Sequence, residues 1–188
     1  EGLLRLDEGN QTQLSAGAPI RVGERLLAVA HPATIELSDG THLDLHADTE
    51  LSFRRESSGG LTVLLHGAEG RLFCEVAKRE APFRVVSRDL TVEVLGTQFA
   101  VDQEVRVSRV VVVEGRVEAS SGTDRRVLTA DQGAELRDGL AKLEPLQVTA
   151  RDRVGWLPRV REGGAAEPAP ALREVRRRRV ERLERGGH

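Results

Sequence analysis

The chain has 188 residues, 39% of them hydrophobic and 3% aromatic, with a formal net charge of −2 at pH 7. This length suits one domain of ordinary size with an appendage. The single cysteine, Cys74, excludes an intrachain disulfide, and no apolar run approaches the ~20 residues of a membrane-spanning helix. The chain starts at Glu1 without a signal peptide. We therefore expect a mature or excised portion of a protein whose membrane anchor lies outside these residues.

Charge divides the chain into an acidic body and a basic tail. Residues 151–188 contain 11 Arg and 6 Asp or Glu, whereas residues 1–150 contain 17 basic and 24 acidic residues. With so few aromatic side chains, valine, leucine and alanine must form most of the core. Valine-rich alternating segments favour strands, because β-branched side chains fit a pleated surface.

Short segments of alternating apolar and polar residues run through the body. Alternation with a period of two places one set of side chains on each face of a sheet. Residues 3–14 alternate only weakly, and residues 105–113 are rich in valine on both faces, which indicates burial on both sides. The expected strands lie within residues 18–26, 33–37, 41–46, 51–53, 61–65, 71–77, 83–86, 92–94, 99–101, 105–113, 117–119, 127–128 and 134–136.

The spacing of these segments predicts the fold class. Turn signals recur about every 8–12 residues, and no segment before residue 150 has a convincing helical pattern. Short connections favour antiparallel neighbours. We therefore expect an all-β domain over residues 2–150, a two-layer roll or sandwich of stacked strands with a solenoid-like arrangement.

Residues 92–101, with the sequence VEVLGTQFAV, are the most informative stretch of the body. Alternation on either side of Gly96 indicates two strands, and a glycine inside a strand pattern marks a bulge or a close backbone approach. Gly96 and Thr97 are therefore expected to turn the backbone so that Phe99 rejoins the core.

The tail has a different composition from the body. Residues 151–170 are expected to form a linker in which Trp156 is an anchor onto the body, and residues 171–185 a short basic amphipathic helix. The run Arg176, Arg177, Arg178 and Arg179 is expected to dock a partner, with an anionic surface as the alternative. Interleaved glutamates and missing aromatics disfavour nucleic acid.

A search for chemistry yields one metal hypothesis and no catalytic site. His42, Asp44 and His46 share one face of a strand and could contribute to a zinc site, but an ordinary polar outer face is the favoured interpretation. Cys74 alternates with Leu72 and Val76, so its thiol is expected in the core. Motifs for nucleophilic catalysis or phosphate binding are absent from the sequence, and we expect no enzyme activity, cofactor or metal.

Six pieces of sequence in order resemble the FecR family of cell-envelope regulators. They are the strand and turn at residues 35–41, the segment 47–51, GRLFCEVA at 70–77 with PFRV at 82–85, VEVLGTQFAV at 92–101, VVVVEGRV at 110–117, and LTADQG at 128–133. The resemblance marks as fold-determining Asp39, Gly40, Phe73, Pro82, Phe83, Gly96, Thr97, Phe99, Glu114 and Gly115. Cys74 stands where a large aromatic residue is common, and the closing glycine is displaced by two residues.

The resemblance implies the periplasmic part of an inner-membrane regulator in an anti-sigma factor pathway. It implies a non-catalytic domain whose partner is an envelope protein, in the best-known systems the signalling domain of an outer-membrane transporter. Many relatives continue into a small α/β domain, for which the residues after Trp156 are too few. A glycan- or peptidoglycan-binding module is the alternative, and the sequence leaves the signal, the partner and the oligomeric state open.

Overall fold

The structure is a computed structural model that describes residues 2–137 and 142–146. These residues belong to one compact unit, Glu1–Arg153. The expected linker at 151–170 with Trp156, the helix at 171–185 and the arginine run Arg176–Arg179 lie outside the described residues, and they stay predictions.

The described residues form strands joined by turns, without a helix. The strands are β1 (Leu3–Asp7), β2 (Asn10–Gln13), β3 (Arg25–Ala28), β4 (Ala33–Glu36), β5 (His42–Leu45), β6 (Glu50–Arg55), β7 (Leu61–His66), β8 (Gly70–Glu75), β9 (Phe83–Ser87), β10 (Leu90–Val94), β11 (Gln98–Glu104), β12 (Val107–Glu114), β13 (Arg116–Ser121), β14 (Asp124–Thr129), β15 (Gly133–Arg137) and β16 (Glu144–Pro145).

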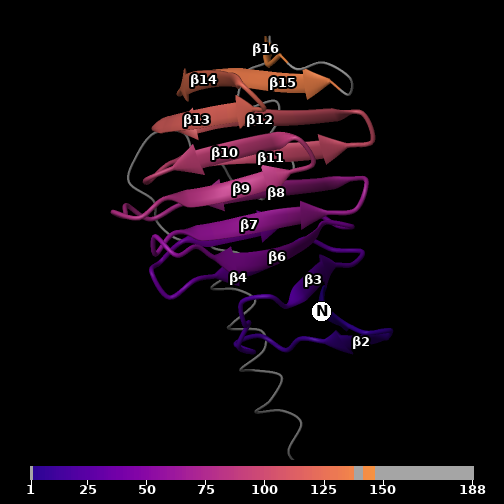
Figure 1. The fold of residues 1–188 in the computed structure, drawn as a ribbon. Helices are drawn as coiled ribbons and strands as arrows, with labels where there is room; N and C mark the ends of the chain where they lie inside the picture. The colour runs from indigo at the N-terminus through magenta and orange to yellow at the C-terminus, as the bar shows by residue number, and fades with distance from the viewer. Residues whose placement is uncertain (1, 138–141, 147–188) are drawn as a thin grey trace, which may run out of the picture. The chain divides into compact units, whose positions relative to one another are not determined.

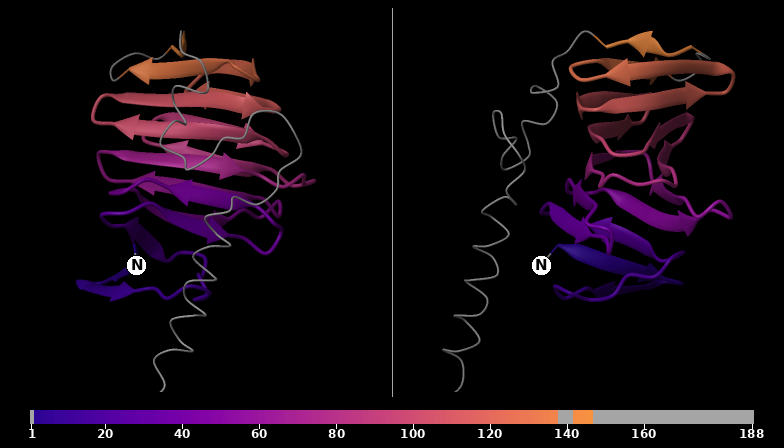
Figure 2. Two further views of the ribbon diagram at one scale, coloured as in Figure 1. Left: turned by 180° about the vertical axis from the view of Figure 1, so that it is seen from behind. Right: turned by 90° about the vertical axis from the view of Figure 1, so that its left-hand side faces the viewer.

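Two sheets are built from these strands (Figure 1). The nine-stranded sheet has the order β14-β13-β10-β9-β7-β6-β3-β1-β2, and the seven-stranded sheet has the order β16-β15-β12-β11-β8-β5-β4. All pairs are antiparallel except β7 with β9, which is parallel. The strands are stacked along each sheet, and neither sheet closes into a barrel (Figure 2). The predicted all-β, mostly antiparallel two-layer fold is confirmed.

The chain builds the two sheets by changing from one to the other at short intervals. Hairpins β4–β5, β11–β12 and β15–β16 lie in the seven-stranded sheet, whereas hairpins β6–β7, β9–β10 and β13–β14 lie in the nine-stranded sheet. Only β8 enters the seven-stranded sheet as a single strand between two hairpins. Because a hairpin cannot bury its apolar face alone, each one packs against the next hairpin in the facing sheet.

The core lies between the sheets and uses alternate residues from both. Phe83 of β9 and Phe99 of β11 are fully buried there, together with valines such as Val92 and Val110. Cys74 is also fully buried in this cluster, as the alternation in β8 predicted, and burial raises the pKa of its thiol well above the usual value.

The structure departs from the predicted strands at three places. Strands β1 and β2 form a hairpin in the segment that alternates only weakly. The sequence does not predict β2 because all four of its side chains are exposed and leave no apolar pattern. Val105 lies in the turn before β12 with 53% of its surface exposed, whereas Val110, Val111 and Val112 are buried. Within residues 18–26, only Arg25 and Leu26 belong to a strand.

Replacing Phe99 tests whether this motif residue determines the fold. The Phe99→Ala variant should lose about 3–5 kcal/mol of unfolding free energy, since it leaves a cavity between the sheets. Leu95→Ala, four residues earlier and 54% exposed, should change it by less than about 0.5 kcal/mol. Urea denaturation followed by circular dichroism measures both. If Phe99→Ala is too unstable to purify, Phe99→Leu should show a smaller loss, and equal stability of Phe99→Leu and Leu95→Ala would contradict the assignment.

Candidate functional site

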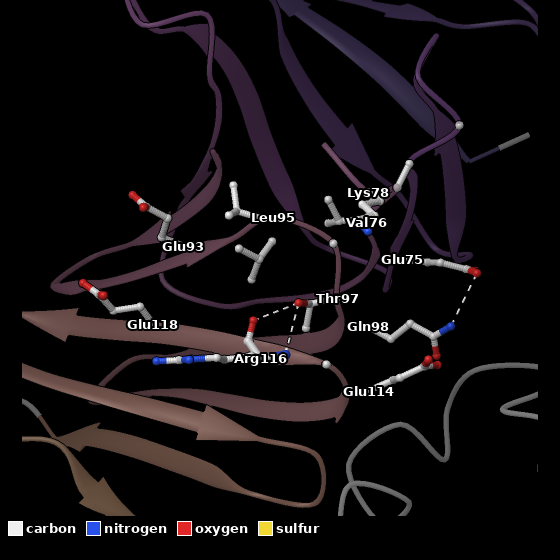
Figure 3. Close-up of a pocket in the computed structure, with 15 residues that line it drawn as sticks. Glu75, Val76, Lys78, Glu93, Leu95, Thr97, Gln98, Glu114, Arg116 and Glu118 are labelled. Carbon is white, nitrogen blue, oxygen red and sulfur yellow. Dashed lines mark hydrogen bonds between the residues drawn. The ribbon is translucent and has the colours of Figure 1, made fainter. Parts of the chain in front are cut away.

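A groove of about 720 Å³ opens at one end of β8, where the chain changes sheets at three levels (Figure 3). Its walls come from residues 75–78, which follow β8 toward β9, from residues 93–98, which lead from β10 into β11, and from residues 114–116 between β12 and β13. The groove is therefore made of crossover segments together with the strand ends beside them.

A buried threonine ties these crossovers together. The Thr97 hydroxyl donates to the Arg116 carbonyl oxygen at 2.8 Å, and the Arg116 N–H donates to the Thr97 hydroxyl at 3.4 Å (Figure 3). The Thr97 carbonyl oxygen accepts from the Val76 N–H at 3.0 Å. Because Thr97 is 5% exposed, these groups have little access to water, and the bonds fix the spacing of the three segments.

Two further threonines have the same relation to a crossover. The Ala77 N–H donates to the Thr41 hydroxyl at 3.2 Å. At the opposite end of β8, the Thr49 hydroxyl donates to the Arg71 carbonyl oxygen at 3.0 Å and accepts from the Arg71 N–H at 2.9 Å. Thr41 and Thr49 are fully buried. Buried side-chain hydroxyls thus bond backbone groups near the points where the chain changes sheets.

Two glycines allow the crossovers to approach closely. Gly96 has φ of 150°, and a Cβ there would lie 3.0 Å from the Lys78 Cα. Gly115 has φ of 90°, and a Cβ there would lie 3.0 Å from the Thr97 hydroxyl oxygen. Any side chain at either position would meet backbone or the buried hydroxyl, in a conformation that favours glycine. The bulge between Gln98 and Phe99 follows directly, as the sequence predicted near Gly96.

Carboxylates outnumber cations around the groove. Four glutamates line it, against Lys78 and Arg116. Figure 3 shows the glutamates in two groups, Glu93 with Glu118 and Glu75 with Glu114. The groove therefore has a negative field that favours positively charged groups.

The two groups of glutamates differ in their partners. Glu93 pairs with Arg84 at 2.6 Å, and Glu118 pairs with Arg125 at 3.2 Å. Glu75 accepts one long hydrogen bond of 3.5 Å from the Gln98 amide. Glu93 and Glu118 are thus paired with arginines, whereas Glu75 and Glu114 form no ion pair with another described residue.

The structure brings half of the predicted motif residues to this groove. Its lining includes Gly40, Gly96, Thr97, Glu114 and Gly115. The sequence pattern singles out none of Glu75, Glu93 and Glu118. Their proximity depends on strand register, which alternation does not specify.

The remaining motif residues lie in the core or at turns. Phe83 and Phe99 are buried between the sheets, whereas Phe73 alternates with Cys74 and is buried outside the core cluster, at 7% exposure. The Asp39 carboxylate accepts from the Thr41 N–H at 3.0 Å.

Arg79 links two of these motif residues. Its guanidinium pairs with Asp39 at 3.3 Å and lies over the Phe83 ring, 5.6 Å from the centroid.

Pro82, another motif residue, contributes a backbone bond: its carbonyl oxygen accepts from the Leu61 N–H at 3.1 Å. The fold-determining role of the ten motif residues stays a prediction that substitutions must test.

The metal hypothesis receives no support from the described part of the chain. His42 and Asp44 lie on β5 and His46 follows it, yet the described residues contain no group of three or more histidine, cysteine or acidic side chains placed to hold a metal ion. The Asp44 carboxylate accepts from the Thr34 hydroxyl at 2.6 Å. Burial raises the Asp44 pKa despite that hydrogen bond and the nearby His42.

The fold and the groove define a class of protein: a two-sheet domain of stacked strands whose crossovers form a charged recess. Comparison with protein families then gives the family. The family model described as FecR protein matches residues 28–118, so this region belongs to the FecR family. It extends from the end of β3 into β13 and contains all the residues that line the groove. No curated protein matches the sequence.

The fold is shared with two crystal structures, at 2.50 Å and 1.65 Å resolution, of a "putative anti-sigma factor" from Parabacteroides distasonis. Each has a TM-score of 0.62 and 24% sequence identity, and the similarity covers 70% of this chain and 62% of that one. The chain thus spans less than two thirds of that protein's length. Within the described strands and turns, no helix is long and apolar enough to cross a membrane.

Replacing the Thr97 hydroxyl by a methyl group measures the contribution of its hydrogen bonds. Thr97→Val should lower the unfolding free energy by about 1–3 kcal/mol, because the buried Arg116 backbone groups lose a partner. Thr97→Ser keeps the hydroxyl and should lose less. Thr123→Val, at an exposed turn, is the control for the same chemical change and should lie within about 0.5 kcal/mol of the parent chain. Chemical denaturation at a fixed pH measures all three. A Thr97→Val variant no less stable than Thr97→Ser would contradict a structural role for these bonds.

Proposed function

We propose that this chain is the periplasmic, non-catalytic part of an inner-membrane regulator, and that it binds a protein partner in the cell envelope within an anti-sigma factor pathway. The observation that carries the proposal is the FecR match over residues 28–118, which contain the groove. The shared fold with a protein described as an anti-sigma factor agrees with it. The membrane anchor of such a regulator would lie outside these 188 residues.

The composition of the groove supports binding rather than catalysis. Its lining residues include no histidine, serine or cysteine, and its one hydroxyl, that of Thr97, bonds the Arg116 backbone. Nucleophilic catalysis by serine, cysteine or histidine is therefore not supported by this lining. Exposed carboxylates and the exposed side chain of Leu95 offer a partner charge and apolar contact.

The crossover hydrogen bonds also suggest how a bound partner would be sensed. Thr97 connects the segments at Val76 and Arg116, so the groove walls cannot move independently without breaking buried hydrogen bonds. Binding would therefore change the position or accessibility of the whole domain relative to the rest of the regulator. Control of the sigma factor would follow from that displacement on the other side of the membrane.

Deleting the domain from the chromosomal gene tests this function. A strain whose gene lacks the codons for residues 2–146 of this chain should show altered transcription from the promoters of one alternative sigma factor. RNA sequencing and a promoter fusion measure this transcription. Alkaline phosphatase fused after residue 146 of the full-length gene should be active, since it folds only outside the cytoplasm.

Three results would contradict the proposed function. They are an unchanged transcriptome, an inactive phosphatase fusion, and retention of the purified chain on isolated peptidoglycan in place of any regulatory effect. The last result would favour the glycan-binding alternative.

A further inference from the structure

One motif residue has a side chain that the fold does not use. The described glycines of the motif occupy backbone conformations that favour glycine, and Thr97 forms buried hydrogen bonds. Glu114, in contrast, is exposed, and among the described residues its carboxylate has no hydrogen-bond or ion-pair partner. A different residue at position 114 with a similar backbone preference would allow the same turn before Gly115. The carboxylate therefore points to a role in binding rather than in folding.

Strand register places Glu114 at one end of a row of oxygen acceptors. Gln98 pairs with Glu75 of β8 on one side and with Glu114 of β12 on the other. The Gln98 amide N–H donates to Glu75 at 3.5 Å, so the amide oxygen is turned toward Glu114 (Figure 3). Two carboxylates and an amide oxygen thus lie together on three adjacent strands. Such a set of acceptors is stabilised by a group with several N–H donors.

The rest of the groove favours a cation attached to an apolar stem. Leu95 is 54% exposed on the wall that residues 93–98 form, close to Thr97 and Gln98 in the chain. Neither Lys78 nor Arg116 forms an ion pair with Glu75 or Glu114. The lining therefore leaves these two carboxylates available to a positive group from outside the chain.

We propose that this groove binds an extended segment of a protein partner that presents an arginine next to an apolar residue. The guanidinium would donate to the row Glu75–Gln98–Glu114, and the apolar side chain would pack on Leu95. Arginine fits better than lysine because its planar guanidinium presents five N–H donors and matches carboxylates in pairs. This inference rests on the proposed function and adds the chemistry of the partner.

A labelled peptide tests the inference on the full 188-residue chain. The probe is a fluorescein-labelled octapeptide with the core Arg-Leu-Arg between glycine and serine residues, and fluorescence anisotropy measures its affinity. The matched peptide carries citrulline in place of arginine, which keeps the shape and removes the charge. The arginine peptide should bind more tightly, and its affinity should fall as salt is raised from ~50 to ~200 mM.

Charge-neutral variants of the groove locate the binding site. Glu114→Gln and Glu75→Gln should each weaken binding of the arginine peptide by roughly fivefold, the upper range for exposed ion pairs. Glu8→Gln removes an exposed carboxylate at the turn between β1 and β2 and should leave the affinity unchanged. All three positions are on the surface or partly exposed, so thermal unfolding should show equal stability. Equal affinity of the arginine and citrulline peptides, or equal loss in Glu8→Gln, would overturn the inference.

The chromosomal assay separates this inference from the proposed function. The Glu75→Gln/Glu114→Gln double variant should alter the sigma-dependent promoter fusion in the same direction as deletion of codons 2–146. If the deletion alters the fusion and the double variant does not, the groove is not the partner site and only this inference fails. If neither alters it, the proposed function fails as well.

Discussion

The hydrogen bonds between buried threonine hydroxyls and crossover backbones are the constraint on which the rest of this structure depends. After β3 the chain changes sheets every one or two strands, and backbone groups at each change need partners outside the strand ladders. Thr41, Thr49 and Thr97 supply those partners from inside the protein. Thr97 bonds the start of β13, Thr49 bonds β8, and Thr41 bonds the segment that follows β8, so each hydroxyl connects segments far apart in the chain. Gly96 and Gly115 permit the approach that the Thr97 bonds require.

Once the crossovers are fixed, the core follows from simple alternation. Valine and leucine at every second position face the opposite sheet, and few aromatic residues are needed because each level is only two strands wide. The same arrangement explains why Cys74 is chemically quiet: it occupies an inward position of β8, where burial disfavours the thiolate. Stability therefore comes from one continuous core of mostly small side chains that extends along the stack.

The sequence predicts this fold well because the features it depends on are local. Alternation, turn glycines and the kink at Gly96 are all visible within a few residues. The β1–β2 hairpin is invisible to the same reasoning, because the β2 side chains are exposed and carry no pattern. The groove is hidden for another reason. Glu75 and Glu114 are far apart in the chain, and only the pairing of both with Gln98 brings them together. Pairing of β7 with β9 is likewise a long-range choice that alternation cannot specify.

The parallel pairing of β7 with β9 also explains why a recess forms at these crossovers. Two parallel strands in one sheet need a connection that returns to the starting end, and β8 in the facing sheet supplies most of it. The return takes seven residues between β8 and β9, whereas the crossings before β11 and before β13 take three and one. Residues 75–78 at the start of this long return line the groove, and Lys78 closely approaches Gly96 there. The recess therefore lies where β8, a single strand between two hairpins, connects to β9.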